Sequence, residues 1–222
     1  MLEGRFVQEK KNRFLCEVVV DGSLQECYIP ASCHLSHFIN LQNKIVYLKE
    51  NASSNARTRF SVYGVRIGHR CIPLQLAISN KIIFDNIESS LFSFLGSRKN
   101  VTQEKMVDGY KCDLFIDDTK TIIEIKSIIE MSDIAVFPSV YSERANKQLS
   151  ALLGLLEKGY KVCYFFISLN PQVHAIRIND NIPEFYKPFS DCINKNMTVR
   201  GYSIKMNTSG KTSLYKEIGI VQ

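Results

Sequence analysis

Three residues near the middle of the chain have the types and the spacing that metal-assisted chemistry on a phosphate ester requires. Asp113 is followed eleven residues later by Glu124, and Lys126 lies two residues further on in an apolar, strand-like run. Alternate residues of a strand point to the same face. We therefore expect Glu124 and Lys126 on one face, with Ile123 and Ile125 on the other.

Two carboxylates and an ammonium group placed in this way suit the hydrolysis of a phosphodiester. The hard carboxylate oxygens bind Mg²⁺, and the metal stabilises the charge that develops on the phosphate. The lysine orients the attacking water or helps to deprotonate it. An exposed Glu–Lys pair on an edge strand produces the same pattern without any chemistry, so the surrounding elements must decide between the two interpretations.

The second part of the chain has the element order of a nuclease fold. Apolar spacing and turn residues predict helices over residues 81–95, 142–158 and 184–196, and strands over 101–107, 111–116, 121–126, 161–167 and 202–206. The order helix, three strands, helix, strand puts the two carboxylates on adjacent central strands. This is the arrangement of the restriction-endonuclease-like core.

The first 80 residues are predicted to form short strands joined by tight turns, over residues 14–20, 25–29, 44–49, 57–67 and 71–76. Five such strands suit a small OB-like barrel. Arg57 and Arg59 are expected on one strand face, with Phe60 and Val62 on the other. Basic side chains beside aromatic ones suit single-stranded nucleic acid, although a solvated outer face explains this strand equally well.

The charge and the cysteine content indicate the kind of partner and the cellular compartment. The net charge is +6, and residues 1–84 hold 11 Lys and Arg against 6 Asp and Glu, which favours an anionic partner for the N-terminal part. Seven cysteines occur without a Cys-x-x-Cys pair, which is typical of reduced thiols in a cytoplasmic protein. No run approaches 18 apolar residues, so we expect no membrane segment.

Several short motifs occur in order along most of the chain. They are Arg13-Phe14-Leu15 with Asp21-Gly22, Lys81-Ile82-Ile83, the set Glu104, Gly109 and Asp113, Glu124-Ile125-Lys126-Ser127, Phe137-Pro138, and Glu143-Arg144 with Lys147. On these motifs the chain resembles the sugar fermentation stimulation protein A (SfsA) family, described as DNA-binding proteins or DNA/RNA nucleases.

The resemblance implies an α+β protein of two domains. Residues 1–80 would form an OB-like β-barrel that binds nucleic acid, and residues 81–222 a PD-(D/E)xK nuclease-like α/β domain with a mixed central sheet. The catalytic residues would be Asp113, Glu124 and Lys126. The metal, Mg²⁺ or Mn²⁺, would be held by Asp113, Glu124 and the carbonyl of Ile125, with support from Asp85 or Glu104. The expected nucleic-acid contacts are Arg13, Arg57, Arg59, Lys111, Arg144, Lys147 and Gln148, of which the last three also fit a solvated helix face.

The chain departs from the family pattern at a few places around the expected substrate. The departures are Pro30-Ala31-Ser32-Cys33 in place of Pro-Asn-Thr-Gly, Ala56 in place of a basic residue, Ser139 in place of an acid, Ala145 in place of a glycine, and Gln148 in place of a histidine. The metal-binding triad is intact.

We therefore predict a metal-dependent nuclease that hydrolyses DNA or RNA. Two alternatives remain: a DNA-binding regulator that keeps the fold without cutting, and an interaction module whose basic barrel binds another anion. We expect nucleic acid as the partner and no membrane. A homodimer is compatible with this prediction.

Overall fold

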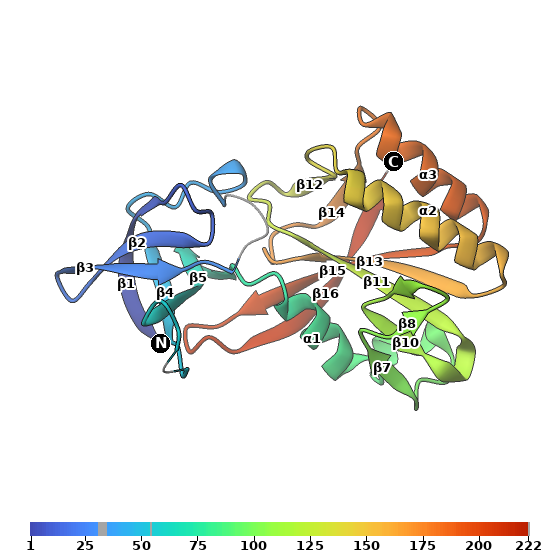
Figure 1. Ribbon diagram of the computed structural model, residues 1–222, viewed down its shortest axis with the longest axis horizontal. Helices are drawn as coiled ribbons and strands as arrows, with labels where there is room; N and C mark the ends of the chain where they lie inside the picture. Colours follow the sequence, from blue (N-terminus) through green and yellow to red (C-terminus); the bar gives the residue numbers. More distant parts are fainter. Residues whose placement is uncertain (31–34, 54, 222) are drawn as a thin grey trace.

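The computed structural model describes residues 1–30, 35–53 and 55–221. Figure 1 shows a β-barrel, built from the first part of the chain, at one end of the molecule and a larger sheet flanked by helices at the other. Among the described residues, no helix is both long and apolar enough to cross a lipid bilayer. The six described cysteines are buried and unpaired. Cys33 and the departure over residues 31–33 lie outside the described residues.

Five strands close the N-terminal barrel. They pair in the order β3–β2–β1–β4–β5, and a parallel pairing of β3 with β5 closes the circle. Phe6, Val18 and Val62 are among the apolar side chains that fill the interior. The arrangement is consistent with the predicted OB-like barrel. The strands are β1 (Leu2–Glu9), β2 (Leu15–Val20), β3 (Ser23–Tyr28), β4 (Ile45–Glu50) and β5 (Phe60–Ile67).

The barrel contains one strand that the sequence pattern did not predict. β1 was missed because half of its residues are polar and only Gly4 and Phe6 are buried, so it has no clear apolar pattern. The strand predicted over residues 71–76 is β6 (Arg70–Pro73), which pairs with β5 and also reaches β15 of the larger sheet. The strand predicted over 57–67 begins at Phe60, so Arg57 and Arg59 lie in the preceding loop and not on a strand face.

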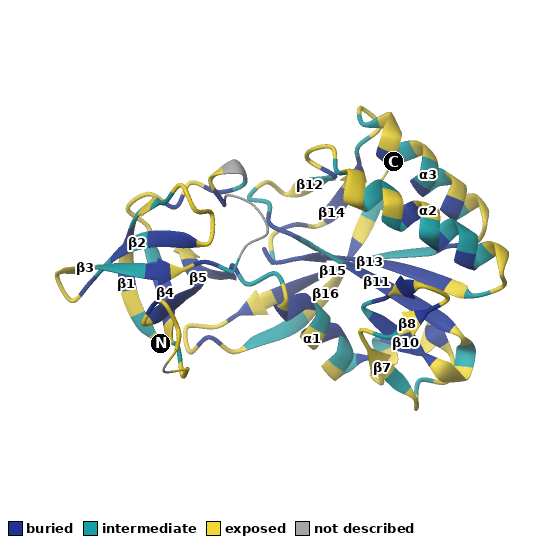
Figure 2. Cartoon of the chain, in the orientation of Figure 1, coloured by how far each residue is buried: buried dark blue, intermediate teal, exposed yellow. Residues whose placement is uncertain are grey.

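The larger sheet is mixed, as predicted, with strand order β6-β15-β13-β11-β10-β7. β11, β13 and β15 are parallel, and β10 and β7 are antiparallel to their neighbours. Figure 2 shows buried residues along these central strands. The strands are β7 (Val101–Gln103), β10 (Leu114–Ile116), β11 (Thr121–Ile128), β13 (Lys161–Ser168) and β15 (Thr198–Met206), and a separate hairpin pairs β8 (Met106–Val107) with β9 (Tyr110–Lys111).

A second group of strands, which joins the larger sheet at β15, was not predicted. Only β15 itself was predicted. β12 and β16 flank β14 in parallel, and β16 also pairs with β15. Two of these strands have only four residues, and β16 is largely exposed, so neither a long apolar run nor a buried face marks them. They are β12 (Ile134–Phe137), β14 (Ala175–Ile178) and β16 (Thr212–Val221).

Helices cover both faces of the larger sheet (Figure 1). On one face, α2 and α3 pack through Leu149, Leu152 and Phe189. On the other, α1 and a 3-10 helix pack through Ile83 and Phe92. The helices are α1 (Ile78–Asn86), α2 (Glu143–Glu157) and α3 (Pro183–Asn194), with 3-10 helices at Leu35–His37, Ser90–Leu95 and Asp117–Thr119.

The helix predicted over residues 81–95 is two elements. α1 ends at Asn86, and a separate 3-10 helix follows from Ser90. Ser89 between them is extended, with φ −64° and ψ 160°. The amide of Ser89 donates to the carbonyl of Asn86 at 2.9 Å, which closes a tight turn in place of a further α-helical turn. The apolar spacing continues across the break and conceals it. The helix predicted over 142–158 is present, and Ser142 caps it by accepting a hydrogen bond from the amide of Ala145 at 3.3 Å.

Candidate functional site

A cleft of about 760 Å³ opens beside the ends of β10 and β11 in the larger lobe. The start of α1, the hairpin strand β9, the segment 138–142 and the first turns of α2 form its walls. Its polar lining comes from widely separated parts of the sequence and includes Asn80, Glu104, Lys111, Asp113, Glu124, Lys126, Ser127, Arg144 and Gln148.

Asp113 and Glu124 face each other because of the register between β10 and β11. Leu114 pairs with Ile123 in an antiparallel ladder, so the position before Leu114 lies opposite the position after Ile123. Side chains directly opposite in such a ladder have Cβ atoms roughly 5 Å apart. The eleven-residue spacing between Asp113 and Glu124 is therefore the length of a hairpin that places the two acids opposite each other.

Glu124 is only 3% exposed, and three side chains hold its carboxylate. The hydroxyl of Tyr110 donates to Oε2 at 2.5 Å, while Lys126 Nζ and Gln148 Nε2 donate to Oε1 at 2.6 and 3.1 Å. Lys126 Nζ also donates to Gln148 Oε1 at 2.7 Å. As predicted, Glu124 and Lys126 share one face of β11, and Ile123 and Ile125 pack in the core on the other.

Asp113 is held by the backbone of the neighbouring strand. The amide of Ile125 donates to Oδ2 at 2.7 Å, and Asn80 Nδ2 donates to Oδ1 at 2.9 Å. Burial raises the pKa of the Asp113 carboxyl above its usual value, and the negative charge of Glu124 raises it further. These two hydrogen bonds and the nearby Lys126 lower this pKa and offset part of the increase.

Tyr164 lies beside the acids on the next parallel strand. It pairs with Glu124 in the register of β11 and β13, and its ring centroid is 5.8 Å from Lys126 Nζ. Its buried hydroxyl makes no hydrogen bond within the described part of the chain. Burial raises the pKa of Tyr164, and the charges of Glu124 and Asp113 raise it further, so this hydroxyl stays protonated beside the two acids.

The donor set of the cleft fits a hard divalent cation. Within the described residues no third His, Cys, Asp or Glu completes a three-ligand cluster with Asp113 and Glu124. Mg²⁺ is commonly bound by one or two carboxylates and fills its other positions with water and phosphate oxygens. The carbonyl of Ile125 points to the Asp113 side of β11, because the N–H and C=O of a strand residue point the same way. Two carboxylates and one carbonyl therefore face the same space.

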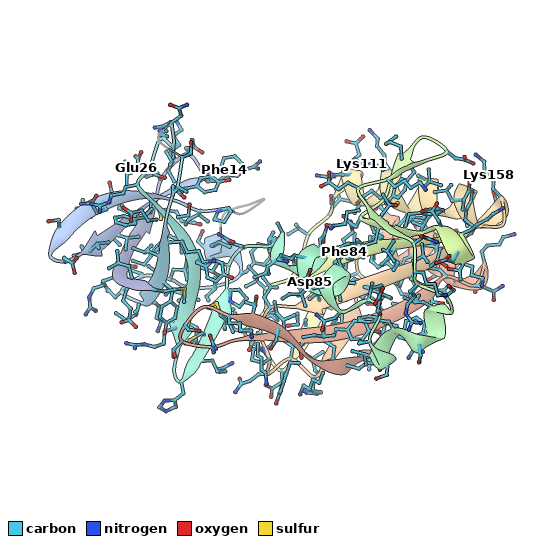
Figure 3. The ribbon with its side chains drawn as sticks, turned by 90° about the horizontal axis from the view of Figure 1, so that it is seen from below. Phe14, Glu26, Phe84, Asp85, Lys111 and Lys158 are labelled. Atoms are coloured by element: carbon cyan, nitrogen blue, oxygen red, sulfur yellow. The ribbon has the colours of Figure 1, made fainter. Side chains whose placement is uncertain are left out.

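The other two predicted metal residues, Glu104 and Asp85, are each paired with a lysine. Glu104 lies at the rim of the cleft and pairs with Lys111 at 2.7 Å. Asp85 is exposed, pairs with Lys81 at 2.7 Å and does not line the cleft. It lies apart from Lys111 in Figure 3. Five residues advance a helix by about 140° beyond a full turn, so α1 presents Asn80 to the cleft and turns Asp85 away from it.

The predicted nucleic-acid residues fall into two groups. Arg144 and Gln148 line the cleft together with Lys111, whereas Lys147 pairs with Glu143 at 2.7 Å on the outer turn of α2. The three arginines Arg13, Arg57 and Arg59 are on the barrel, and Arg59 pairs with Glu50 at 2.9 Å.

Sequence reasoning missed three polar residues of the site: Asn80, Tyr110 and Tyr164. Tyr110 carried a usable signal, because it directly follows the predicted Asp108-Gly109 turn of the hairpin that leads to Asp113. Gln148, which stands where the family has a histidine, bridges Glu124 and Lys126 through its side-chain nitrogen and oxygen.

Comparison with known proteins gives consistent matches over most of the chain. A family model described as "Sugar fermentation stimulation protein RE domain" matches residues 77–210. A sugar fermentation stimulation protein homolog of Desulfitobacterium hafniense (strain Y51) is 26% identical over 180 residues, covering 80% of this chain and 77% of that protein. A homolog of the same name from Methanobrevibacter smithii is 25% identical over 217 residues, covering 91% and 90%.

A solved structure shares the fold. The structure of Pyrococcus furiosus SfsA in complex with Ca²⁺ matches with a TM-score of 0.85 and 19% identity, covering 100% of this chain and 96% of that one. The barrel and the mixed sheet are thus both features of that fold.

Proposed function

We propose that this chain, which belongs to the sugar fermentation stimulation protein (SfsA) family, is a divalent-metal-dependent nuclease that hydrolyses phosphodiester bonds of DNA or RNA. The observation that carries the proposal is the acid pair Asp113 and Glu124, facing each other inside an open cleft with Lys126 Nζ 2.6 Å from one of them. The predicted PD-(D/E)xK character of the larger domain is part of the same proposal.

A purely structural role explains this arrangement poorly. Burying one carboxylate beside one lysine already costs desolvation energy, and a second acid beside the first adds repulsion. The raised pKa of Asp113 reflects that cost. Strained titratable groups in a cleft are typical of functional sites, where a cation or substrate offsets the repulsion.

The residues divide into a metal-holding group and groups that orient them. Asp113, Glu124 and the carbonyl of Ile125 would hold Mg²⁺ or Mn²⁺, which supplies Lewis-acid stabilisation of the phosphate and a more acidic water. Tyr110 and Gln148 fix the Glu124 carboxylate from two sides. The Pyrococcus furiosus relative was solved in complex with Ca²⁺, another cation that prefers oxygen ligands.

We assign to Lys126 the role of acting on the reacting atoms. In hydrolysis, a bond forms between phosphorus and the water oxygen while the bond from phosphorus to a sugar oxygen breaks. The water loses a proton, and the leaving sugar oxygen gains one. The Lys126 ammonium, held by Glu124 and Gln148, orients the water and stabilises the negative charge on the phosphate. Arg144 and Lys111 line the cleft and would contact flanking phosphates.

A cleavage assay tests the proposal. Labelled single- and double-stranded DNA and RNA are incubated with the protein and Mg²⁺, Mn²⁺ or EDTA, beside a Glu124→Gln variant purified in the same way. We expect cleavage of at least one substrate with metal, and none with EDTA or with the variant. Binding to the same substrates without cleavage under every condition would instead support the DNA-binding regulator.

Metal binding should depend on pH through Asp113. Because its pKa is raised, protons compete with the metal at a higher pH than they would at an ordinary aspartate, whose pKa is about 3.9. We expect Mn²⁺ affinity to fall as pH is lowered toward the raised pKa, with proton release on binding. Calorimetry in two buffers of different ionisation enthalpy measures that release. A Mn²⁺ affinity that falls only at the low pH expected for an ordinary aspartate would contradict the expectation.

A further inference from the structure

Two aromatic rings of the barrel are exposed and stack on each other. Phe14 is 36% exposed and Tyr28 is 39% exposed, and their ring centroids are 6.3 Å apart with an interplanar angle of 20°. Leu15, the residue after Phe14, pairs with Tyr28 in the ladder of β2 and β3, and the amide of Ile29 donates to the carbonyl of Phe14 at 2.9 Å. The backbone thus holds the two residues next to each other.

The rings do not serve the barrel core, which is filled by residues such as Phe6, Val18 and Val62. Single exposed apolar side chains are ordinary on a protein surface, but here two nearly parallel rings stack on each other and form an exposed apolar platform. This Phe14–Tyr28 platform borders a groove of about 490 Å³. The groove is also lined by polar residues, namely Asn12, Asn51, Arg57, Thr58 and Ser61.

Positive charge flanks the platform. The guanidinium carbon of Arg13 is 4.8 Å from the centroid of the Phe14 ring. Arg57 has a 72% exposed side chain, and its neighbouring acid, Glu26, lies 3.7 Å away. Glu26 is itself bound by Lys10 at 2.7 Å, so the local acid is already neutralised and Arg57 can contact an added anion.

The platform occupies the place on the barrel where OB folds bind extended ligands. Such barrels bind oligonucleotides and oligosaccharides through the face of strands 2 and 3 and through the loops joining strands 1–2 and 4–5. Here Phe14 and Arg13 belong to the first of those loops, Arg57 to the second, and Tyr28 to β3. The basic side chains favour the oligonucleotide over a neutral saccharide.

We propose that Phe14 and Tyr28 stack with the bases of a single-stranded nucleic acid while Arg13 and Arg57 contact its phosphates. Bases of a duplex are already stacked on one another and expose only their edges, so the platform selects single strands. In Figure 3, Phe14 and Lys111 lie on facing sides of the space between the two lobes. A strand seated on the platform is thereby directed toward the rim of the metal cleft. This inference rests on the proposed function only for what happens to the strand afterwards.

The test measures binding separately from cleavage. Fluorescence anisotropy in EDTA compares a labelled single-stranded oligonucleotide with a duplex of the same length. We expect wild-type protein to prefer the single strand, and Phe14→Ala with Tyr28→Ala to weaken that binding at least about thirtyfold, from two lost stacking contacts. Leu24→Ala is the matched control, because Leu24 is 58% exposed on the same strand but does not line the groove. Tyr28→Phe should bind as wild type does, since it keeps the ring.

A second variant reports stacking directly. The chain contains no tryptophan, so Phe14→Trp introduces a single tryptophan, which can be excited selectively over the tyrosines, into the platform. We expect the single strand to quench its emission with the same midpoint as the anisotropy change. Unquenched emission while anisotropy rises, or equal affinity of the double alanine variant and wild type, would overturn the platform. Cleavage in Mn²⁺ is measured in a separate assay. Loss of the predicted stacking would therefore not contradict the proposed nuclease, and quenching without cleavage would contradict the nuclease but not the stacking.

Discussion

Replacing Lys126 by methionine should slow cleavage by roughly a hundred- to a thousandfold, the usual cost of losing one preorganised charge at the transition state. Methionine keeps much of the length of the side chain and removes only the ammonium. Lys126 is half-buried and is held by Glu124 and Gln148, so its charge acts on the reacting phosphate more than on a passing strand. Nucleic-acid affinity should therefore change little. Single-turnover cleavage at saturating protein separates the two effects.

Lys111 provides the control for that experiment. It is an exposed lysine at the rim of the same cleft, paired with Glu104. Lys111→Met should weaken binding and leave the saturated single-turnover rate close to that of wild type. If Lys126→Met instead reduces affinity and rate in parallel, Lys126 is a phosphate contact and takes no part in the chemical step.

Asp113→Ala should lower the affinity for Mn²⁺ by more than about a hundredfold, since even the outer partners of metal ligands are worth about ten- to a hundredfold. The variant removes one of two carboxylates and leaves Glu124 already bound by Tyr110, Lys126 and Gln148. Too few free oxygens then remain to hold the ion. Calorimetry with Mn²⁺ measures the loss, and cleavage should disappear with it.

Asp85→Ala is the matched variant for Asp113→Ala. It removes an acid from α1 that is exposed and bound to Lys81, outside the cleft. Its Mn²⁺ affinity should equal that of wild type. Equal and weak heats of Mn²⁺ binding for wild type and Asp113→Ala would argue against a metal site between the two acids. A loss of Mn²⁺ affinity in Asp85→Ala would show that Asp85 contributes to the metal site.

The sequence was informative where local rules determine the geometry. The alternation of a strand correctly placed Glu124 and Lys126 on one face, and the hairpin spacing brought Asp113 opposite Glu124. Helix 142–158 had a capping serine and a regular apolar stripe, and it is present. The boundary between domains at residue 80 stays a prediction, because β6 pairs with both the barrel and the larger sheet.

Other features depend on contacts that no local pattern carries. β1 is polar because a closed barrel leaves one face of each strand in water. The structure has Asn80 at the site where Asp85 was predicted, because the face that α1 turns to the cleft depends on where the helix packs. Tyr164 is part of an apolar run, so the sequence marked it as core, and only the parallel register of β11 and β13 brings it beside Glu124.

The most direct test of the account is cleavage in water enriched in ¹⁸O. A substrate that is cut in the presence of Mn²⁺ is incubated with wild-type protein under single-turnover conditions, and the product phosphate is analysed by mass spectrometry. Attack by water at phosphorus predicts one ¹⁸O atom in the new terminal phosphate of one fragment and an unlabelled hydroxyl on the other, with no product from Lys126→Met on the same timescale. An oligonucleotide left intact under every metal condition, a product phosphate without ¹⁸O, or a 2′,3′-cyclic phosphate from RNA would contradict a metal-dependent hydrolase at this cleft.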